Sequence, residues 1–100
     1  MTYEIEFKDS AQKEWDKLDN SIQIQFKKKL EKIVINPHVP KNKLSNMSNC
    51  YKIKLRDAGY RLVYEVEDKI VTIFVVSIGK RDKQEAYKNA EKRITSRIED

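Results

Sequence analysis

The feature that most constrains the fold is the stretch from residue 51 to residue 78, which is typical of three consecutive β-strands. Residues 51–55 and 60–67 alternate apolar and polar side chains, the period of a half-buried strand. Residues 70–78 are apolar at nearly every position, which predicts a strand covered on both faces at the centre of a sheet. The short segment Arg56–Gly59 between the first two strands ends on a glycine, which favours a turn.

Two helices are expected before these strands. Residues 3–7 alternate like a strand, and Asp9 with Gln12 has the spacing of a capping box at a helix start. The cluster Asp19-Asn20-Ser21 separates the two helices and can cap the second. Apolar residues recur at helical spacing in both: Ala11, Trp15, Leu18, Ile22, Phe26, Leu30 and Ile33. We therefore expect a helical hairpin with Trp15 in the core.

The second helix should end at Asn36-Pro37, because the residue before proline avoids the helical region. Residues 36–49 show no period, and a loop this long in a small domain is often functional. Asp82 with Glu85 predicts the start of a last helix that continues to about Ile98. Its apolar stripe is thin, so weak docking and mobility are expected.

The element order β-α-α-β-β-β-α predicts an α+β fold: one small domain over residues 1–100 with a mostly antiparallel four-stranded sheet. The net charge of +5 and the pI of about 9.3 favour a polyanionic or acidic partner, although solubility alone is an alternative. No apolar run reaches membrane length, the start of the chain lacks a signal-peptide layout, and the single Cys50 can form no internal disulfide. We expect a cytoplasmic protein with no membrane association.

The register of the central hairpin predicts a basic patch. Placing the apolar residues of both strands on one face requires Leu55 opposite Tyr60, because a one-residue slip would expose one apolar set. Lys54 then lies opposite Arg61, and Lys52 lies on the same outer face. Like charges directly opposite each other destabilise a sheet, so the patch favours an anionic ligand. The alternative is a solvated basic face with the side chains splayed apart.

Other chemistries have little support in the sequence. With one histidine, His38, and one cysteine, Cys50, the chain lacks the clustered ligands of a structural metal site. His38 is interpreted as a surface loop residue and Cys50 as a core or strand-edge residue. The two glycines lie far apart and form no phosphate-binding loop. We expect neither a metal nor a cofactor.

The sequence resembles the RelE family of toxins from RelBE toxin–antitoxin systems. The similar segments are Cys50-Tyr51-Lys52-Ile53-Lys54-Leu55-Arg56, Gly59-Tyr60-Arg61-Leu62-Val63-Tyr64, Trp15, Lys27-Lys28-Lys29-Leu30, Asn42-Lys43-Leu44 and Gly79-Lys80-Arg81 with Tyr87. They are spread over roughly residues 1–95. The pattern departs at Ser45, where close relatives carry a basic residue, which puts one RNA or ribosome contact in doubt.

The resemblance implies an α+β toxin that cleaves mRNA in the A site of the 70S ribosome. It implies active-site roles for Lys52, Lys54, Arg61, Arg81 and Tyr87, and the basic residues expected to contact RNA or the ribosome are Lys27, Lys28, Lys29, Lys43, Arg56 and Lys80. The expected partner is a RelB-like antitoxin with an acidic, partly disordered segment able to displace the last helix, and operator DNA would be contacted only through it. Two alternatives are a ParE-like gyrase poison and a non-catalytic corepressor module.

The implied cleavage needs no metal. The RNA 2′-hydroxyl attacks its own phosphate, and the protein aligns the attack, neutralises developing charge and moves two protons. Free lysine is a poor base at neutral pH, but neighbouring positive charges lower its pKa, which favours Lys54 as a base. Tyr87 is expected to stack on a base or to share in proton transfer. Spacing alone does not assign base and acid among Lys54, Arg81 and Tyr87.

Overall fold

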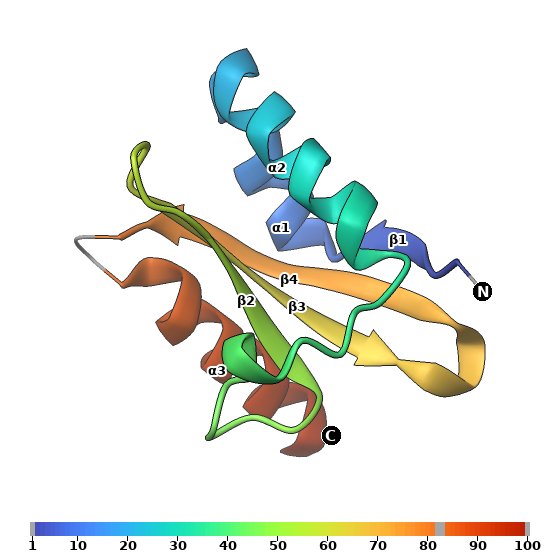
Figure 1. The fold of residues 1–100 in the computed structure, drawn as a ribbon. Coiled ribbons are helices and arrows are strands. Elements are labelled where there is room, and N and C mark those ends of the chain that lie inside the picture. The colour runs from blue at the N-terminus through green and yellow to red at the C-terminus, as the bar shows by residue number, and fades with distance from the viewer. Residues whose placement is uncertain (1, 82–83, 100) are drawn as a thin grey trace.

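The computed structural model describes residues 2–81 and 84–99, with side chains through residue 94. Figure 1 shows a sheet with helices on both of its faces. The elements, in chain order, are β1 (Glu4–Phe7), α1 (Asp9–Asp16), α2 (Asn20–Ile33), the 3-10 turn η1 (Pro40–Asn42), β2 (Cys50–Leu55), β3 (Tyr60–Glu67), the 3-10 turn η2 (Asp68–Ile70), β4 (Thr72–Lys80) and α3 (Glu85–Glu99). The predicted α+β class and element order are confirmed.

The sheet has the order β1-β4-β3-β2, in which β1 runs parallel to β4 and the other pairs are antiparallel. β4 lies between β1 and β3, as its two-sided apolar pattern predicted. It begins at Thr72 rather than Ile70, because residues 68–70 form a 3-10 turn in which the Asp68 carbonyl accepts from the Val71 amide.

Two apolar cores lie on opposite faces of the sheet. The larger core packs α1 and α2 against the sheet, and Trp15 belongs to it, as predicted. The smaller core includes Cys50 and Val63 from the sheet and Ala86 and Ala90 from α3. α3 therefore covers part of the outer face of the central hairpin, so the alternative of a simply solvated basic face does not hold there.

The side-chain caps predicted for α1 and α2 are not formed. α1 begins after Lys8 with no side-chain cap, and the Gln12 amide donates instead to the Asp16 carboxylate at 3.1 Å. α2 begins after Asp19, whose backbone carbonyl, rather than its side chain, accepts from the amides of the first turn. The predicted cap at Asp82 lies outside the described residues.

The aperiodic loop after α2 is tied to the sheet by hydrogen bonds. The His38 ring lies 3.1 Å from the Tyr51 hydroxyl and 2.8 Å from the Asp68 carboxylate, and the Tyr64 hydroxyl donates to the Pro37 carbonyl. The Leu44 amide donates to the Cys50 carbonyl at 2.9 Å. The spacing of apolar residues could not predict that this loop is held in place, because each of these hydrogen bonds joins residues far apart in the sequence. Among the described residues, no helix is long and apolar enough to cross a membrane.

Candidate active site

The register of the β2–β3 hairpin is the one that the sequence predicted. Leu55 pairs with Tyr60 and Lys54 pairs with Arg61. Lys52, two residues along β2, shares their face of the sheet, which is the face that α3 covers. Lys52, Lys54 and Arg61 are accordingly half-buried rather than fully solvated.

Three of the predicted active-site cations surround one hollow of about 210 Å³. Lys54, Arg61 and Arg81 line it together with Arg56, and no carboxylate of the described residues is among its lining. Arg81 comes into place because its backbone amide donates to the Gly59 carbonyl at 2.7 Å, which ties the end of β4 to the β2–β3 turn. Lys52 lies beside this hollow in a second, larger groove that also includes Lys54.

Tyr87 reaches this cluster from α3. The Arg61 guanidinium donates to the Tyr87 hydroxyl at 2.7 Å, and its central carbon lies 5.3 Å from the centre of the tyrosine ring. The Tyr87 oxygen acts as an acceptor in this contact, which leaves its own proton available to another group. The sheet and α3 thus each contribute a part of the site.

The electrostatics of the cluster act on Lys54. The positive charge of Lys52 lowers the pKa of Lys54 below its usual value, and partial burial, Arg61 and Arg56 lower it further. The sequence predicted the direction of this shift. The largest cause, however, is the neighbour along the same strand rather than the residue paired across the hairpin.

A β-bulge in β4 shapes the contact between α3 and the sheet. Val63 pairs with Ser77 while Tyr64 pairs with Val75, so Val76 is an extra residue without a partner in β3. A bulge turns the backbone groups beside it out of the regular ladder. Val76 belongs to the core under α3, and the Ser77 hydroxyl donates to the Ala86 carbonyl of that helix.

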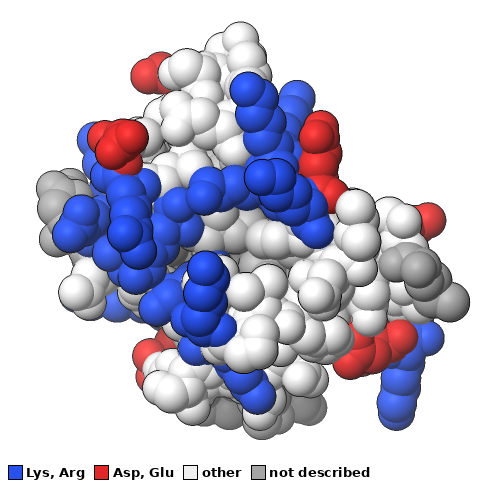
Figure 2. Space-filling model, viewed as in Figure 1, with Lys and Arg blue, Asp and Glu red and all other residues white. Residues whose placement is uncertain are grey.

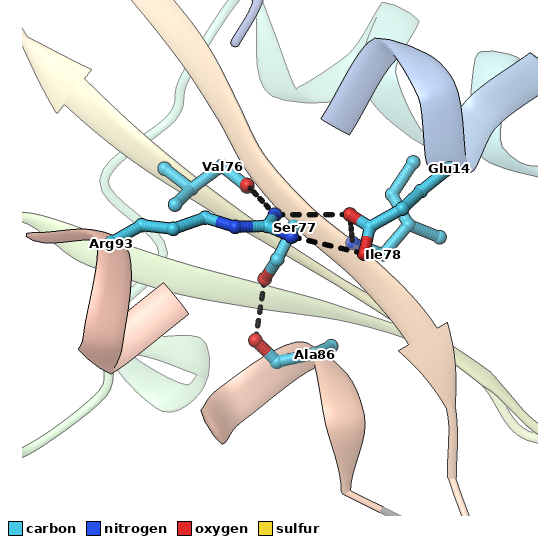
Figure 3. A network of polar contacts seen from close by, with 6 residues as sticks. All are labelled: Glu14, Val76, Ser77, Ile78, Ala86 and Arg93. Atoms are coloured by element: carbon cyan, nitrogen blue, oxygen red, sulfur yellow. Dashed lines mark hydrogen bonds and ion pairs between the residues drawn. The ribbon is translucent and has the colours of Figure 1, made fainter. Parts of the chain in front are cut away.

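A polar clamp satisfies the backbone groups beside this bulge (Figure 3). Arg93 of α3 donates to the Val76 carbonyl at 2.6 Å and to both carboxylate oxygens of Glu14 at 3.0 and 3.2 Å. Glu14 of α1 also accepts from the Ile78 amide at 3.1 Å. We call Glu14 and Arg93 the α1–α3 clamp; it joins two helices through one edge of the sheet.

Sequence reasoning missed this clamp, although a signal was present. Arg93 follows Ala90 by three residues and so falls on the inward stripe of α3, where a charged residue requires a partner. The expectation of weak docking considered only apolar side chains. Fully buried alanines and the clamp hold α3 closely, and Gly79 permits this approach, since a Cβ there would lie 2.8 Å from the Glu85 Cβ.

The other predicted contact residues are not gathered in one place. Lys29 and Arg56 line the larger groove, whereas Lys27 lines an apolar crevice beside Trp15. Lys80 lines a separate hollow near Gly59. Lys28 and Lys43 are exposed, and Lys43 forms a bridge to Tyr51 along the edge of β2. Across the described part of the chain, no group of three or more histidine, cysteine or acidic residues could hold a metal ion.

Comparisons with known proteins agree with this architecture. The sequence model of the family described as the ParE toxin of the type II toxin–antitoxin system, parDE, matches residues 5–85. The chain is 50% identical over 94 residues to the mRNA interferase toxin RelE of Escherichia coli K12, which covers 94% of this chain and 99% of that protein.

Two solved structures are also similar. A free double-arginine mutant of the E. coli toxin RelE has 49% identity and a TM-score of 0.87, with 94% of this chain and 99% of that chain covered. The intact E. coli RelBE toxin–antitoxin complex contains a chain with 50% identity and a TM-score of 0.77, with 78% of this chain and 95% of that chain covered. The protein described here therefore belongs to the RelE family of toxins, within the wider superfamily of RelE and ParE toxins from type II toxin–antitoxin systems.

Proposed function

We propose that this protein is a ribosome-dependent endoribonuclease that cuts mRNA in the ribosomal A site and so inhibits translation. The observation that carries the proposal is the hollow lined by Lys54, Arg61 and Arg81, with Tyr87 bonded to Arg61 at its side. Four cations around one hollow suit a phosphate whose negative charge grows in the transition state.

The reaction can be written with the side chains present. A base removes the proton of the 2′-hydroxyl, the 2′-oxygen bonds to phosphorus, and the bond from phosphorus to the 5′-oxygen breaks. The products are a 2′,3′-cyclic phosphate and a 5′-hydroxyl, which takes up one proton. An arginine guanidinium can bind two phosphate oxygens at once. Arg61 and Arg81 are therefore suited to stabilise the phosphorane-like transition state, in which phosphorus has five oxygen neighbours.

Proton transfer is assigned to Lys54 and Tyr87. The lowered pKa of Lys54 increases the fraction of neutral amine that can act as a base. The Tyr87 hydroxyl accepts from Arg61, so its own proton is available to the leaving oxygen. A free lysine is a poor base at neutral pH, so we infer that the ribosome holds the substrate in the reactive geometry. We therefore expect naked mRNA to be cut poorly.

The partners follow from the family and from the charge. We infer a RelB-like antitoxin whose acidic, partly disordered segment neutralises the basic face, and an autoregulatory complex that contacts operator DNA only through the antitoxin. We also propose that the protein acts in the cytoplasm, because mRNA and ribosomes are found there. Lys27, Lys28, Lys29, Lys43, Arg56 and Lys80 are proposed as further contacts to RNA or the ribosome.

The test is primer extension on mRNA bound to purified ribosomes, with single-turnover rates. Lys54→Ala, Arg61→Ala and Arg81→Ala should each lower the rate on the order of a hundredfold to a thousandfold, and lower ribosome binding much less. For comparison, Lys27→Ala and Lys28→Ala also remove one positive charge each, but from proposed ribosome contacts outside the hollow, and should weaken ribosome association modestly and lower its salt dependence. Absence of ribosome-dependent cuts by the unmodified protein would refute the proposal.

The family description supplies one rival, a gyrase poison of the ParE kind. The same protein preparation, incubated with gyrase and supercoiled DNA, separates the two, because a poison yields DNA breaks and leaves mRNA whole. A protein that does neither, and only strengthens operator binding by its antitoxin, is the corepressor alternative.

A further inference from the structure

A second basic groove continues from the proposed catalytic hollow. It has a volume of about 600 Å³ and is lined by residues of α2, η1, β2 and the β2–β3 turn. Among the described residues that line it, six of nine are cations and none is acidic: Lys29, Lys32, Lys41, Lys52, Lys54 and Arg56, with Ile33, Asn42 and Ile53 as the others. In the orientation of Figure 2, Lys and Arg side chains gather over this face, and Asp and Glu side chains lie mainly at its margins.

The absence of carboxylates among these residues distinguishes the groove from an ordinary charged surface. Exposed cations commonly alternate with acidic residues, which neutralise them locally. Here cations from three separate elements face one concave space, and a concave surface of one charge sign concentrates the potential. The lowered pKa of Lys54 indicates that its neighbours' charges act on it directly. An anion bound in the groove would relieve this repulsion.

The groove and the hollow share two residues, Lys54 and Arg56. A polymer cut at the hollow must extend beyond it, and the groove is the adjoining space. Ile33 and Ile53 are buried beneath the groove, and the cations around it suit phosphates at intervals along a chain. The shape and chemistry therefore match a single strand with an anionic backbone.

We propose that this groove binds the RNA strand that continues from the scissile phosphate, with Lys32 of α2 and Lys41 of η1 as phosphate-binding residues. This inference rests on the proposed function, because it takes the hollow as the site of cleavage. It assigns the loop after α2 a role: the contacts of His38 with Tyr51 and Asp68 hold that loop against the sheet, and the loop carries Lys41 into the groove wall.

Binding can be measured without cleavage. A fluorescent 2′-O-methyl oligouridine lacks the attacking hydroxyl, and its affinity can be followed by anisotropy over a range of salt concentrations. Each phosphate contact contributes about 0.7 to the slope of log affinity against log salt for a single strand. The double variant Lys32→Ala/Lys41→Ala should therefore lower the slope by about 1.4. With an unchanged affinity at 1 M salt, this equals roughly 25-fold weaker binding at 0.1 M salt.

The matched control is Lys13→Ala/Lys17→Ala, which removes the same charge from two exposed positions, one in α1 and one directly after it, that do not line the groove. It should leave the slope nearly unchanged. Equal effects of the two double variants would overturn the proposal, because only net charge would then matter. Circular dichroism of each variant verifies that it is folded.

The same variants separate this inference from the proposed function. If the unmodified protein cuts mRNA on ribosomes but the groove variant binds oligouridine normally, the groove assignment alone fails. If the groove variant loses oligouridine binding while the unmodified protein never cuts on ribosomes, the groove stands and the proposed function fails. Weaker association with mRNA-free ribosomes, with unchanged oligouridine binding, would assign the groove to ribosomal RNA and overturn the proposal for the substrate strand.

Discussion

Replacing Arg93 by alanine should loosen α3 without unfolding the sheet. Arg93 and Glu14 are each about a quarter exposed, at 29% and 23%, so solvent weakens their ion pair to about 1 kcal/mol or less. The larger effect is on the Val76 carbonyl, which loses its donor next to the bulge. An unsatisfied buried acceptor costs about 1–3 kcal/mol. With about 2 kcal/mol for the carbonyl, the middle of that range, and up to about 1 kcal/mol for the ion pair, the docked helix is destabilised by roughly 2–3 kcal/mol.

The measurement is native-state hydrogen exchange. Because every 1.4 kcal/mol is a factor of ten, α3 amides should lose roughly 30- to 150-fold in protection, while the amides of β3 and β4 change little. The single-turnover rate on ribosomes should fall as well, since Tyr87 reaches Arg61 only while α3 is docked. Arg93→Lys keeps the charge but loses the two-pronged contact with Glu14, and should be intermediate.

Two outcomes would refute this reasoning. Unchanged α3 protection in Arg93→Ala would show that the buried alanines alone hold the helix. Equal loss of protection in α3 and in the sheet would show that the clamp stabilises the whole fold rather than the docking of one helix. Glu14→Gln serves as a check, because its amide oxygen can still accept from the Ile78 amide while the charge attraction to Arg93 is lost.

Three further predictions concern stability and pH. Gly79→Ala places a Cβ 2.8 Å from the Glu85 Cβ, so α3 must shift; thermal unfolding should show destabilisation of about 1–3 kcal/mol, and an unchanged midpoint would contradict the close approach. Lys52→Ala removes the largest cause of the lowered Lys54 pKa, so the rising limb of the pH–rate profile should move to higher pH; an unmoved limb would exclude Lys54 as the base. Hydrogen bonds from Tyr3 and His38 lower the pKa of Asp68, so its contribution to stability is present above the usual carboxyl pKa of about 3.9 and is lost as the pH falls through the lower value in the folded protein. Asp68→Asn should remove this part of the acid dependence in urea titrations at several pH values, and an unchanged dependence would assign it to other carboxylates.

The parts of the fold that the sequence predicted well are those that depend on local period. Alternation from Tyr51 to Glu67 determines both strands and, through the need to bury one apolar set, the pairing of Lys54 with Arg61. The same reasoning placed Trp15 in the core and β4 at the centre of the sheet. Each of these features follows from apolar residues that recur at the spacing of a strand or of a helix.

The parts that the sequence did not predict depend on distant contacts. The parallel pairing of β1 with β4 and the position of α3 over the hairpin join segments far apart in the chain. The bulge at Val76 lies in a continuous apolar segment, where no change of pattern indicates it. The clamp beside it joins Glu14 and Arg93, which are far apart in the sequence. The Tyr87–Arg61 contact has the same character, so Tyr87 entered the candidate site only through family resemblance.

The clamp has a consequence for solubility. β1 pairs with β4 only as far as Val75, so the strand beyond it would present an open edge. Open edges invite pairing with another chain, and proteins that expose them tend to aggregate. Here Glu14 accepts a hydrogen bond from the Ile78 amide and Arg93 donates one to the Val76 carbonyl, so these backbone groups are not available to a strand of another chain. At the opposite edge, Lys52 and Lys54 of β2 provide like charges that repel a second copy. A chain without the clamp should therefore self-associate through β4, and light scattering of the Arg93→Ala protein at increasing concentration would reveal it.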